Sequence, residues 1–386
     1  MLHIAAGPAE NHQTAPLSRG CAIGSACRGQ LSERIGRRSP VPKPQPSDGG
    51  PVTLRTIADH LGVSVTTVTR ALKGGERIGA DTVEKVKKTA EELGYVRNLD
   101  GVKLRTGQTF VALTFLSFSS EEEIGDSGSV GLLNGIHQRF AGTEYSVRAV
   151  PVTTDEIGLD RVQQVVKGRN ADGIILDHTR PRDERVQFLL EQNVPFVTFG
   201  RTDLPQPHAY FDLDNEYAAY QGTKSLIDQG YGRVAMLDAD LRYSFVGQRL
   251  KGYRRALFEA GIAYDPALVR HIDLSAPVAR NTAIDLIGAK ADAFVCVNEL
   301  VFLGARAGVR QALGPAGDSL GFSLRTGTNI GNYIGTPLNT SYYSRSDAGW
   351  NLADLLLKRL DGADVSDCQR ICKTELRVSE GQTLLG

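Results

Sequence analysis

The chain has 386 residues, enough for two or three domains with more than one hydrophobic core. Hydrophobic residues make up 41% of it, and 44 basic residues balance 44 acidic ones, which fits a soluble globular protein and excludes a strongly charged chain. It has no run of about 18 apolar residues and no apolar export segment, so no membrane span or secretion signal is predicted. Its five cysteines lack zinc-type spacing, and we expect reduced thiols in the cytoplasm.

Residues 1–50 are rich in Gly, Pro, Ser and Arg and show no periodicity, so this segment is predicted to be disordered. Two other interpretations stay open. Translation in the host begins nearer Val52, or the basic residues of this extension form an arm that contacts DNA. Mass spectrometry of the native N-terminus distinguishes a translation start near Val52 from the disordered extension and from the DNA-binding arm.

The stretch from Val52 to Arg70 predicts two short helices joined by a tight turn. Apolar residues recur at helical spacing up to Gly62, which breaks the first helix, and Ser64 is a suitable N-cap for the second. One face of the second helix is apolar, and the other carries small polar groups and an arginine. The pattern is typical of a helix-turn-helix, and an ordinary helical hairpin is the alternative.

The segment 52–98 reads VTLRTIADHLGVSVTTVTRALKGG…IGADTVEKVKKTAEELGYVRN, with the core V-S-x-x-T-V-[ST]-R. It resembles the DNA-binding headpiece of the LacI/GalR family of bacterial transcription regulators. The resemblance implies a headpiece at 51–98 that binds double-stranded operator DNA. It also implies a hinge helix or linker at 99–109, with a leucine that wedges into the minor groove. The DNA-binding residues implied are Thr53, Ser64, Val65, Thr66, Thr69, Arg70 and Leu104.

Two further features of residues 51–109 bear on DNA binding. They carry ten basic and seven acidic residues, a net charge of +3 that a dimer doubles. The Ala-Arg-Ser that usually precedes the hinge leucine is Gly101-Val102-Lys103 here. Because glycine weakens a helix by roughly 1 kcal/mol relative to alanine, we expect this hinge to be less helical until it binds DNA.

From residue 110 onward, short apolar runs rich in β-formers alternate with helical patterns, which predicts an α/β fold of parallel sheets with helices on both faces. About 270 residues in this style suit two sheets rather than one. The region resembles the family's effector-binding core, which has the two-lobed periplasmic-binding-protein fold. We expect crossovers near Asp212–Asn215, near Asn339–Tyr343 and near the C-terminus. The expected N-lobe spans about 110–212 and 324–342, the C-lobe about 213–323 and 343–378, and the tail 379–386.

In open α/β sheets, ligands bind at the carboxyl ends of the strands. Arg249 matches the family position whose arginine hydrogen-bonds vicinal hydroxyls with two parallel donors, and Asn298 matches a pocket asparagine. The family's G-[FY]-[DN]-[DN] is Gly321-Phe322-Ser323-Leu324 here, so an acid is lost. The predicted effector-binding residues are Asp177, Phe211, Phe245, Arg249, Leu274, Asn298, Ser323 and Tyr343.

The expected effector is a sugar, glycoside or sugar alcohol. A purine or phosphorylated metabolite is the alternative, and an anion would favour Arg249 and Arg325. We expect a cytoplasmic homodimeric repressor of carbohydrate uptake or catabolism genes, with no cofactor, no metal and no catalytic residue. A sugar-binding transport module is the competing class, but it would leave residues 52–105 without a role. An enzyme is not expected, because the sequence has no G-x-S-x-G, P-loop or H-E-x-x-H motif.

Overall fold

The computed structural model describes residues 51–74, 77–97, 99–117, 127–152 and 158–379. These residues belong to two compact units, one ending at Asn98 and one beginning at Leu99. The predicted disordered extension at 1–50 and residues 380–386 of the predicted tail lie outside the described residues.

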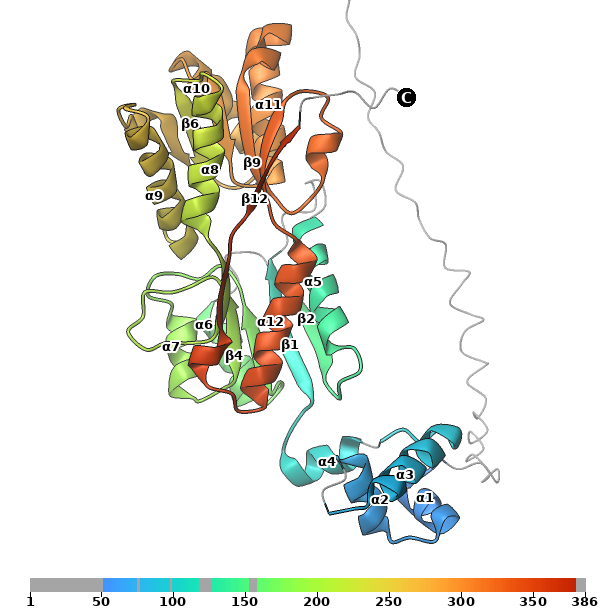
Figure 1. The fold of residues 1–386 in the computed structure, drawn as a ribbon. Coiled ribbons are helices and arrows are strands. Elements are labelled where there is room, and N and C mark those ends of the chain that lie inside the picture. Colours follow the sequence, from blue (N-terminus) through green and yellow to red (C-terminus); the bar gives the residue numbers. More distant parts are fainter. Residues whose placement is uncertain (1–50, 75–76, 98, 118–126, 153–157, 380–386) are drawn as a thin grey trace, which may run out of the picture. The chain divides into compact units, whose positions relative to one another are not determined.

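The first unit, the headpiece, contains three helices in its described part: α1 (Leu54–Leu61), α2 (Val65–Leu72) and α3 (Ala80–Glu92) (Figure 1). Thr53 and Thr56 form a capping box at the start of α1. This helix ends at Gly62, whose φ of 64° is a left-handed conformation that glycine adopts at little cost. The predicted helix-turn-helix is therefore confirmed. Its core consists of Ile57, Ala58, Val68, Ala71, Val86 and Ala90.

The second unit begins with a short helix, α4 (Leu99–Thr106). It is followed by two six-stranded sheets in the described part of the chain. The first sheet has the order β11-β5-β4-β3-β1-β2 and is parallel throughout. Its strands are β1 (Val111–Ser117), β2 (Ser146–Val152), β3 (Gly173–Leu176), β4 (Phe196–Phe199), β5 (Tyr210–Leu213) and β11 (Gln369–Cys372).

The second sheet has the order β12-β10-β9-β8-β6-β7. It is parallel except that β12 runs antiparallel to β10. Its strands are β6 (Val234–Asp238), β7 (Val269–His271), β8 (Ala293–Cys296), β9 (Gly321–Thr326), β10 (Leu338–Tyr342) and β12 (Glu375–Ser379). Two parallel-dominated sheets with helices confirm the predicted fold class.

Each sheet packs helices on both faces, so each lobe has two apolar layers. In the first lobe, α5 (Ser127–Phe140) and α12 (Arg345–Leu360) share one core layer, and α6 (Leu159–Lys167) and α7 (Glu184–Glu191) form the other. In the second lobe, α8 (Asn215–Asp228) packs with α9 (Ser244–Glu259), and α10 (Ala276–Gly288) with α11 (Glu299–Leu313). This arrangement leaves the carboxyl ends of the parallel strands for polar residues.

Three connections between the lobes are seen among the described residues. They follow β5 at Asp214, β10 at residues 343–344 and β11 at residues 373–374. Figure 1 shows the last of them as the red segment that passes from the first lobe to the second.

The expected division of the last third of the core was wrong. Residues 324–342 lie in the second lobe, because β9 and β10 continue the parallel pairing of β8. Residues 345–372 lie in the first lobe, because α12 buries Leu352, Leu355 and Leu356 there and β11 pairs with β5. The lobe to which each of these segments belongs is decided by pairing with strands that are distant in the sequence. The local pattern of residues does not encode that pairing.

None of the described helices is both long and apolar enough to cross a membrane.

Candidate functional sites

The exposed face of α2 carries the residues predicted to read DNA. Val65 is 42% exposed, Thr66 and Arg70 are exposed, and Thr69 is half-buried. The opposite face buries Val68 and Ala71 in the headpiece core. The helix therefore presents a short row of small side chains and one guanidinium to its surroundings.

Thr53 and Ser64 both have a local structural role. The Thr53 hydroxyl accepts from the Thr56 amide at 3.2 Å, and the Ser64 hydroxyl accepts from the Thr67 amide at 3.1 Å. Each therefore fixes the start of a helix by satisfying an amide that has no partner within the helix. Both residues are exposed, and each hydroxyl also forms a hydrogen bond with a threonine hydroxyl, that of Thr56 or Thr67.

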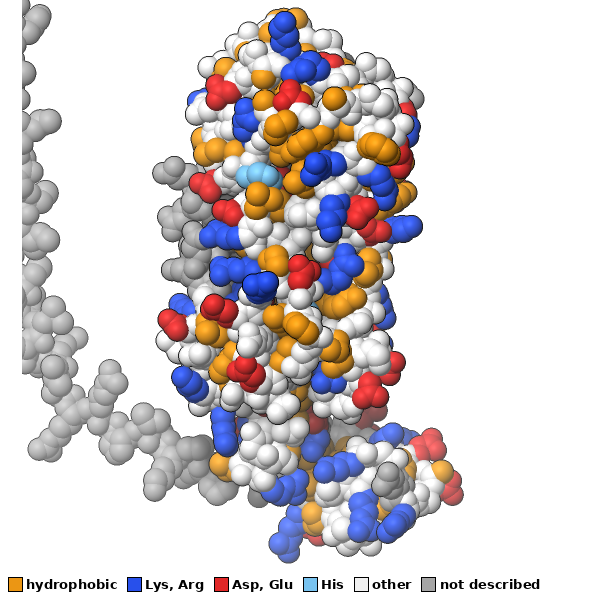
Figure 2. Space-filling view, turned by 90° about the vertical axis from the view of Figure 1, so that its left-hand side faces the viewer, with side chains coloured by type: hydrophobic (Ala, Val, Ile, Leu, Met, Phe, Trp, Pro, Cys, Tyr) orange, Lys and Arg blue, Asp and Glu red, His pale blue; other side chains and the backbone are white. Residues whose placement is uncertain are grey.

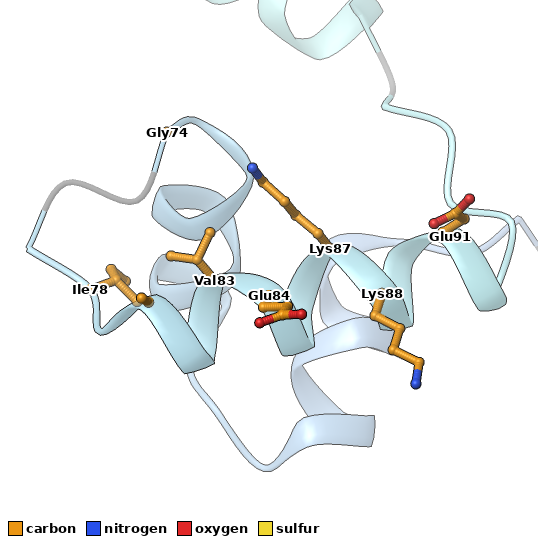
Figure 3. A pocket seen from close by; sticks show the side chains of 8 residues that line it. Gly74, Ile78, Val83, Glu84, Lys87, Lys88 and Glu91 are labelled. Atoms are coloured by element: carbon orange, nitrogen blue, oxygen red, sulfur yellow. The ribbon is translucent and has the colours of Figure 1, made fainter.

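A broad hollow of about 700 Å³ lies on the headpiece beside α3 (Figure 3). Two lysines and two glutamates line it, and Figure 3 shows Lys87 and Lys88 pointing in different directions. Such a mixed and divergent lining offers no converging polar groups for a ligand. On the face drawn in Figure 2, Lys and Arg side chains are spread over the headpiece surface. This spread suits contacts with the phosphates of DNA better than the binding of a small ligand in the hollow.

The helix α4 buries none of its described residues. Leu104 is 90% exposed, and no atom lies within 4 Å of the position that a Cβ at Gly101 would take. An ion pair between Lys103 and Asp100 at 3.5 Å is exposed and adds little. The helix thus has almost no packing support among the described residues, yet it is helical without DNA, which differs from the expectation of a hinge that is less helical until it binds DNA.

One contact between the lobes joins the loop after β3 to the start of α9. The Ser244 amide donates to the Thr179 carbonyl at 3.0 Å. Beside it, the centroid of the His178 ring lies 6.1 Å from that of Phe245, and Nδ1 of His178 lies 3.0 Å from a carboxylate oxygen of Asp177. Asp177 and Phe245, both predicted effector residues, therefore lie on facing sides of this contact.

Phe245 connects this contact to two more predicted residues. The guanidinium carbon of Arg249 lies 4.6 Å from the centroid of the Phe245 ring. Leu274 packs in the same small cluster as Phe245 and Tyr243. Arg249 and Phe245 were predicted from one segment and Leu274 from another, and the structure brings the two segments together.

Arg249 and Asp238 form a buried ion pair at the end of β6. Nε of Arg249 donates to the carboxylate at 2.8 Å, and a second guanidinium nitrogen donates to the other oxygen. The two residues are 3% and 0% exposed. The two parallel donors expected to bind hydroxyls are thus engaged by a carboxylate. The sequence reasoning did not select Asp238, although an acid that ends an apolar strand was a usable signal.

A second contact between the lobes centres on Glu299 and Arg345. One guanidinium nitrogen of Arg345 donates to both carboxylate oxygens, at 3.0 and 2.8 Å. The hydroxyls of Thr326 and Thr328 donate to the same carboxylate at 2.6 and 3.3 Å. A Cβ at Gly327 would come within 2.1 Å of the Arg345 side chain, so glycine leaves the room that this arginine needs. Arg345 was not among the predicted residues.

The ionisation of Glu299 follows from these partners. Burial by itself raises the pKa of a carboxyl group. The charge of Arg345 and the Thr326 hydroxyl outweigh burial here, and the pKa of Glu299 is lowered. The contact between the lobes is therefore an ion pair at neutral pH.

Asn298 and Tyr343 lie beside this second contact. The Asn298 side chain accepts from the Val301 amide at 2.9 Å and so caps α11, directly before Glu299. The centroid of the Tyr343 ring lies 5.4 Å from the guanidinium carbon of Arg325 and 5.7 Å from that of Arg345. Tyr343 therefore lies beside Arg325 and Arg345. Asn298 directly precedes Glu299, the carboxylate that pairs with Arg345.

Two of the predicted residues are buried, Phe211 apart from the others and Ser323 at a small cavity that Arg249 also borders. Phe211 is 2% exposed and packs against Phe199 in the core of the first lobe, so its ring is not available to a ligand there. Ser323 is also 2% exposed and faces Gly222 of α8. It lines a cavity of about 10 Å³, room for roughly one water molecule, together with Arg325 and others.

Two family models match the chain. Residues 53–98 match the bacterial regulatory proteins of the lacI family, and residues 123–314 match the periplasmic binding proteins and sugar binding domain of the LacI family. The two matched segments correspond to the headpiece and to most of the two-lobed core.

Among curated relatives, the chain is 31% identical to the HTH-type transcriptional regulator RafR of Escherichia coli over 56% of this chain and 64% of that protein. It is 27% identical to the HTH-type transcriptional regulator CelR of Thermobifida fusca over 85% of this chain and 97% of that protein. Among solved structures, a complex of the transcriptional regulator CelR with cellobiose is similar in fold. Its TM-score is 0.65 at 24% identity, covering 86% of this chain and all of that one.

Proposed function

Because the chain belongs to the LacI family of bacterial regulatory proteins, we propose that it is a ligand-responsive, sequence-specific repressor of genes for carbohydrate uptake or catabolism. The observation that carries the proposal is the presence of both family domains on one chain, a DNA-binding unit at 53–98 and a sugar-binding unit at 123–314. RafR and CelR, which resemble the chain, are transcriptional regulators rather than enzymes.

In the proposed complex, a homodimer places two headpieces in successive major grooves of a near-palindromic operator. Val65 contacts a thymine methyl group, Thr66 donates or accepts at a base edge, and Arg70 forks onto a guanine. The hinge helices pair in the central minor groove, where Leu104 opens a base step. The exposure of all four side chains supports these roles.

The proposed effector is a sugar-sized molecule that binds between the lobes, near the two contacts that join them. The complex of CelR with cellobiose supports a sugar as its class. The proposed contacts come from Asp177, Phe245, Arg249, Leu274, Asn298 and Tyr343, while Phe211 and Ser323 shape the walls behind them. Effector binding changes how the lobes meet and lowers the affinity for the operator. The coupling free energy between two such sites is typically about 1–3 kcal/mol.

The DNA half of the proposal is tested with Arg70→Ala. Loss of a guanidinium that forks onto guanine should weaken operator binding by about 1–3 kcal/mol, roughly 5- to 150-fold. Fluorescence anisotropy on an operator selected from random DNA measures the affinity. Lys85→Ala, on the exposed side of α3, is the matched control and should change affinity much less. Unchanged affinity in Arg70→Ala would remove α2 as the recognition helix.

The effector half is tested by thermal shift of the full chain against a panel of sugars, glycosides and sugar alcohols. A true effector at 100 times its Kd stabilises the folded core by about 2.7 kcal/mol. The same compound must then release the operator in the anisotropy assay. If no member of this panel, extended to acidic sugars and sugar phosphates, does both, the proposal is contradicted.

A further inference from the structure

Three guanidinium groups gather where the second sheet meets the first lobe. Arg249 is neutralised by Asp238, and Arg345 by Glu299. Arg325, near the end of β9, is the third, and its ring contact with Tyr343 brings no negative charge. Within the described part of the chain, this group therefore carries three positive and two negative charges.

Arg325 stands out because of its missing partner. Its Nε is buried and forms no hydrogen bond, and no ion pair of Arg325 is found among the described residues. Burial lowers the pKa of Arg325, and the nearby charges of Arg249 and Arg345 lower it further, although Tyr343 and Glu299 act in the opposite direction. The same side chain lines the cavity that Ser323 and Arg249 also border.

Arg325 as a whole is half-buried, with its Nε fully enclosed. A charge that is largely removed from water and has no partner is costly, and proteins pair such charges or use them to bind a charged ligand. The two neighbouring carboxylates are already engaged by other cations. Ser323, two residues before Arg325 on the same strand, borders the same cavity and carries no charge that could neutralise Arg325.

We propose that Arg325 binds an anionic group of the effector, a carboxylate or a phosphate, so that the effector is an acidic sugar or a sugar phosphate rather than a neutral sugar. The inference rests on the proposed function, because it takes the region between the lobes as the effector site. A guanidinium is suited to either anion, because it offers paired donors to two oxygens. The aromatic ring of Tyr343 is placed to cover an apolar face of the sugar beside it.

The experiment compares matched compounds by isothermal titration calorimetry on the full chain. The neutral members are glucose, galactose and cellobiose. The acidic members are glucuronate, galacturonate and gluconate, with glucose 6-phosphate as the phosphate source. Acetate and inorganic phosphate serve as anions without a sugar. We expect at least one acidic member to bind about 10- to 100-fold more tightly than its neutral parent, the range for a charge-assisted hydrogen bond.

The variant Arg325→Met keeps the length of the side chain and removes its charge. It should lose the preference for the acidic compound and, without ligand, melt at or above the temperature of the parent chain, because an unpaired buried charge is gone. Arg310→Met is the control. Arg310 is exposed on α11 and pairs with Asp318, so its loss should leave the preference intact.

Three results would overturn the inference. They are equal binding of neutral and acidic partners, unchanged preference in Arg325→Met, and binding of none of the acidic compounds. If a neutral sugar binds and releases the operator, the inference fails while the proposed function stands. If no sugar of either kind binds or alters operator affinity, both fail. Stronger binding of glucose 6-phosphate than of the carboxylates would assign phosphate as the anion.

Discussion

Arg249 shows how a side chain predicted to bind a ligand can also be needed for stability. Its two donors hold Asp238, and both residues are buried. A test that simply removes Arg249 therefore mixes loss of binding with loss of folding. The sequence predicted the location of Arg249 near the effector site but not its partner, because pairing depends on which strand lies next to α9.

Arg249→Ala should destabilise the core by about 3–5 kcal/mol, because it leaves the Asp238 carboxylate buried without a partner. The double variant Asp238→Asn with Arg249→Met should recover much of that loss. Urea denaturation measures both. Lys224→Ala, which breaks an exposed pair with Asp228 in the same lobe, should cost much less, because water screens that pair. A small loss in Arg249→Ala would show that water reaches Asp238.

At the scale of single elements, the helices of the headpiece were the most predictable part. Their apolar spacing, the caps at Thr53 and Ser64 and the glycine at 62 are all local signals, and the structure follows each of them. The last strands and helix of the core were misassigned between lobes. The local pattern predicts ordinary strands and a helix for residues 324–342 and 345–372. The sheet that each strand joins depends on contacts with residues that are distant in the sequence.

The helix α4 leads to a prediction of its own. Gly101→Ala should raise its helicity by roughly 1 kcal/mol, and the open space around Gly101 accommodates the methyl group. If α4 must be helical on DNA, operator affinity should rise by up to about 5-fold in the anisotropy assay. Gly107→Ala is the control. It lies beyond the helix at a φ of 73°, where alanine is strained, and should not strengthen binding. Equal affinity of Gly101→Ala and the parent would mean that α4 is already formed in the free protein.

At the scale of the whole core, the polar contacts between the lobes in the described residues include one at Thr179 and Ser244 and one at Glu299 and Arg345. Both lie next to predicted effector residues. An effector that enters there cannot leave these contacts unchanged, which gives the proposed coupling a physical route. The sequence identified residues on each side but not the contacts, since an ion pair between lobes depends on how the two sheets are joined.

Glu299→Gln should weaken this coupling. It replaces the ion pair with Arg345 by a neutral hydrogen bond and leaves the Asn298 cap in place. The ratio of operator affinities with and without effector, typically 5- to 150-fold, should shrink toward one. Asp318→Asn is the control, because Asp318 pairs with Arg306 and Arg310 inside the second lobe and should not alter the ratio. An unchanged ratio in Glu299→Gln would exclude this ion pair from the response.

The segment 369–379 completes both sheets, since β11 pairs with β5 and β12 with β10. A ribosome makes this segment after nearly all the rest of the core. Until it emerges, β5 and β10 are open edges in the nascent chain, and open edges attract other strands. A premature stop shortly before residue 369 would therefore leave two unfinished lobes rather than one sound and one damaged. Such a fragment should depend on chaperones and be degraded quickly.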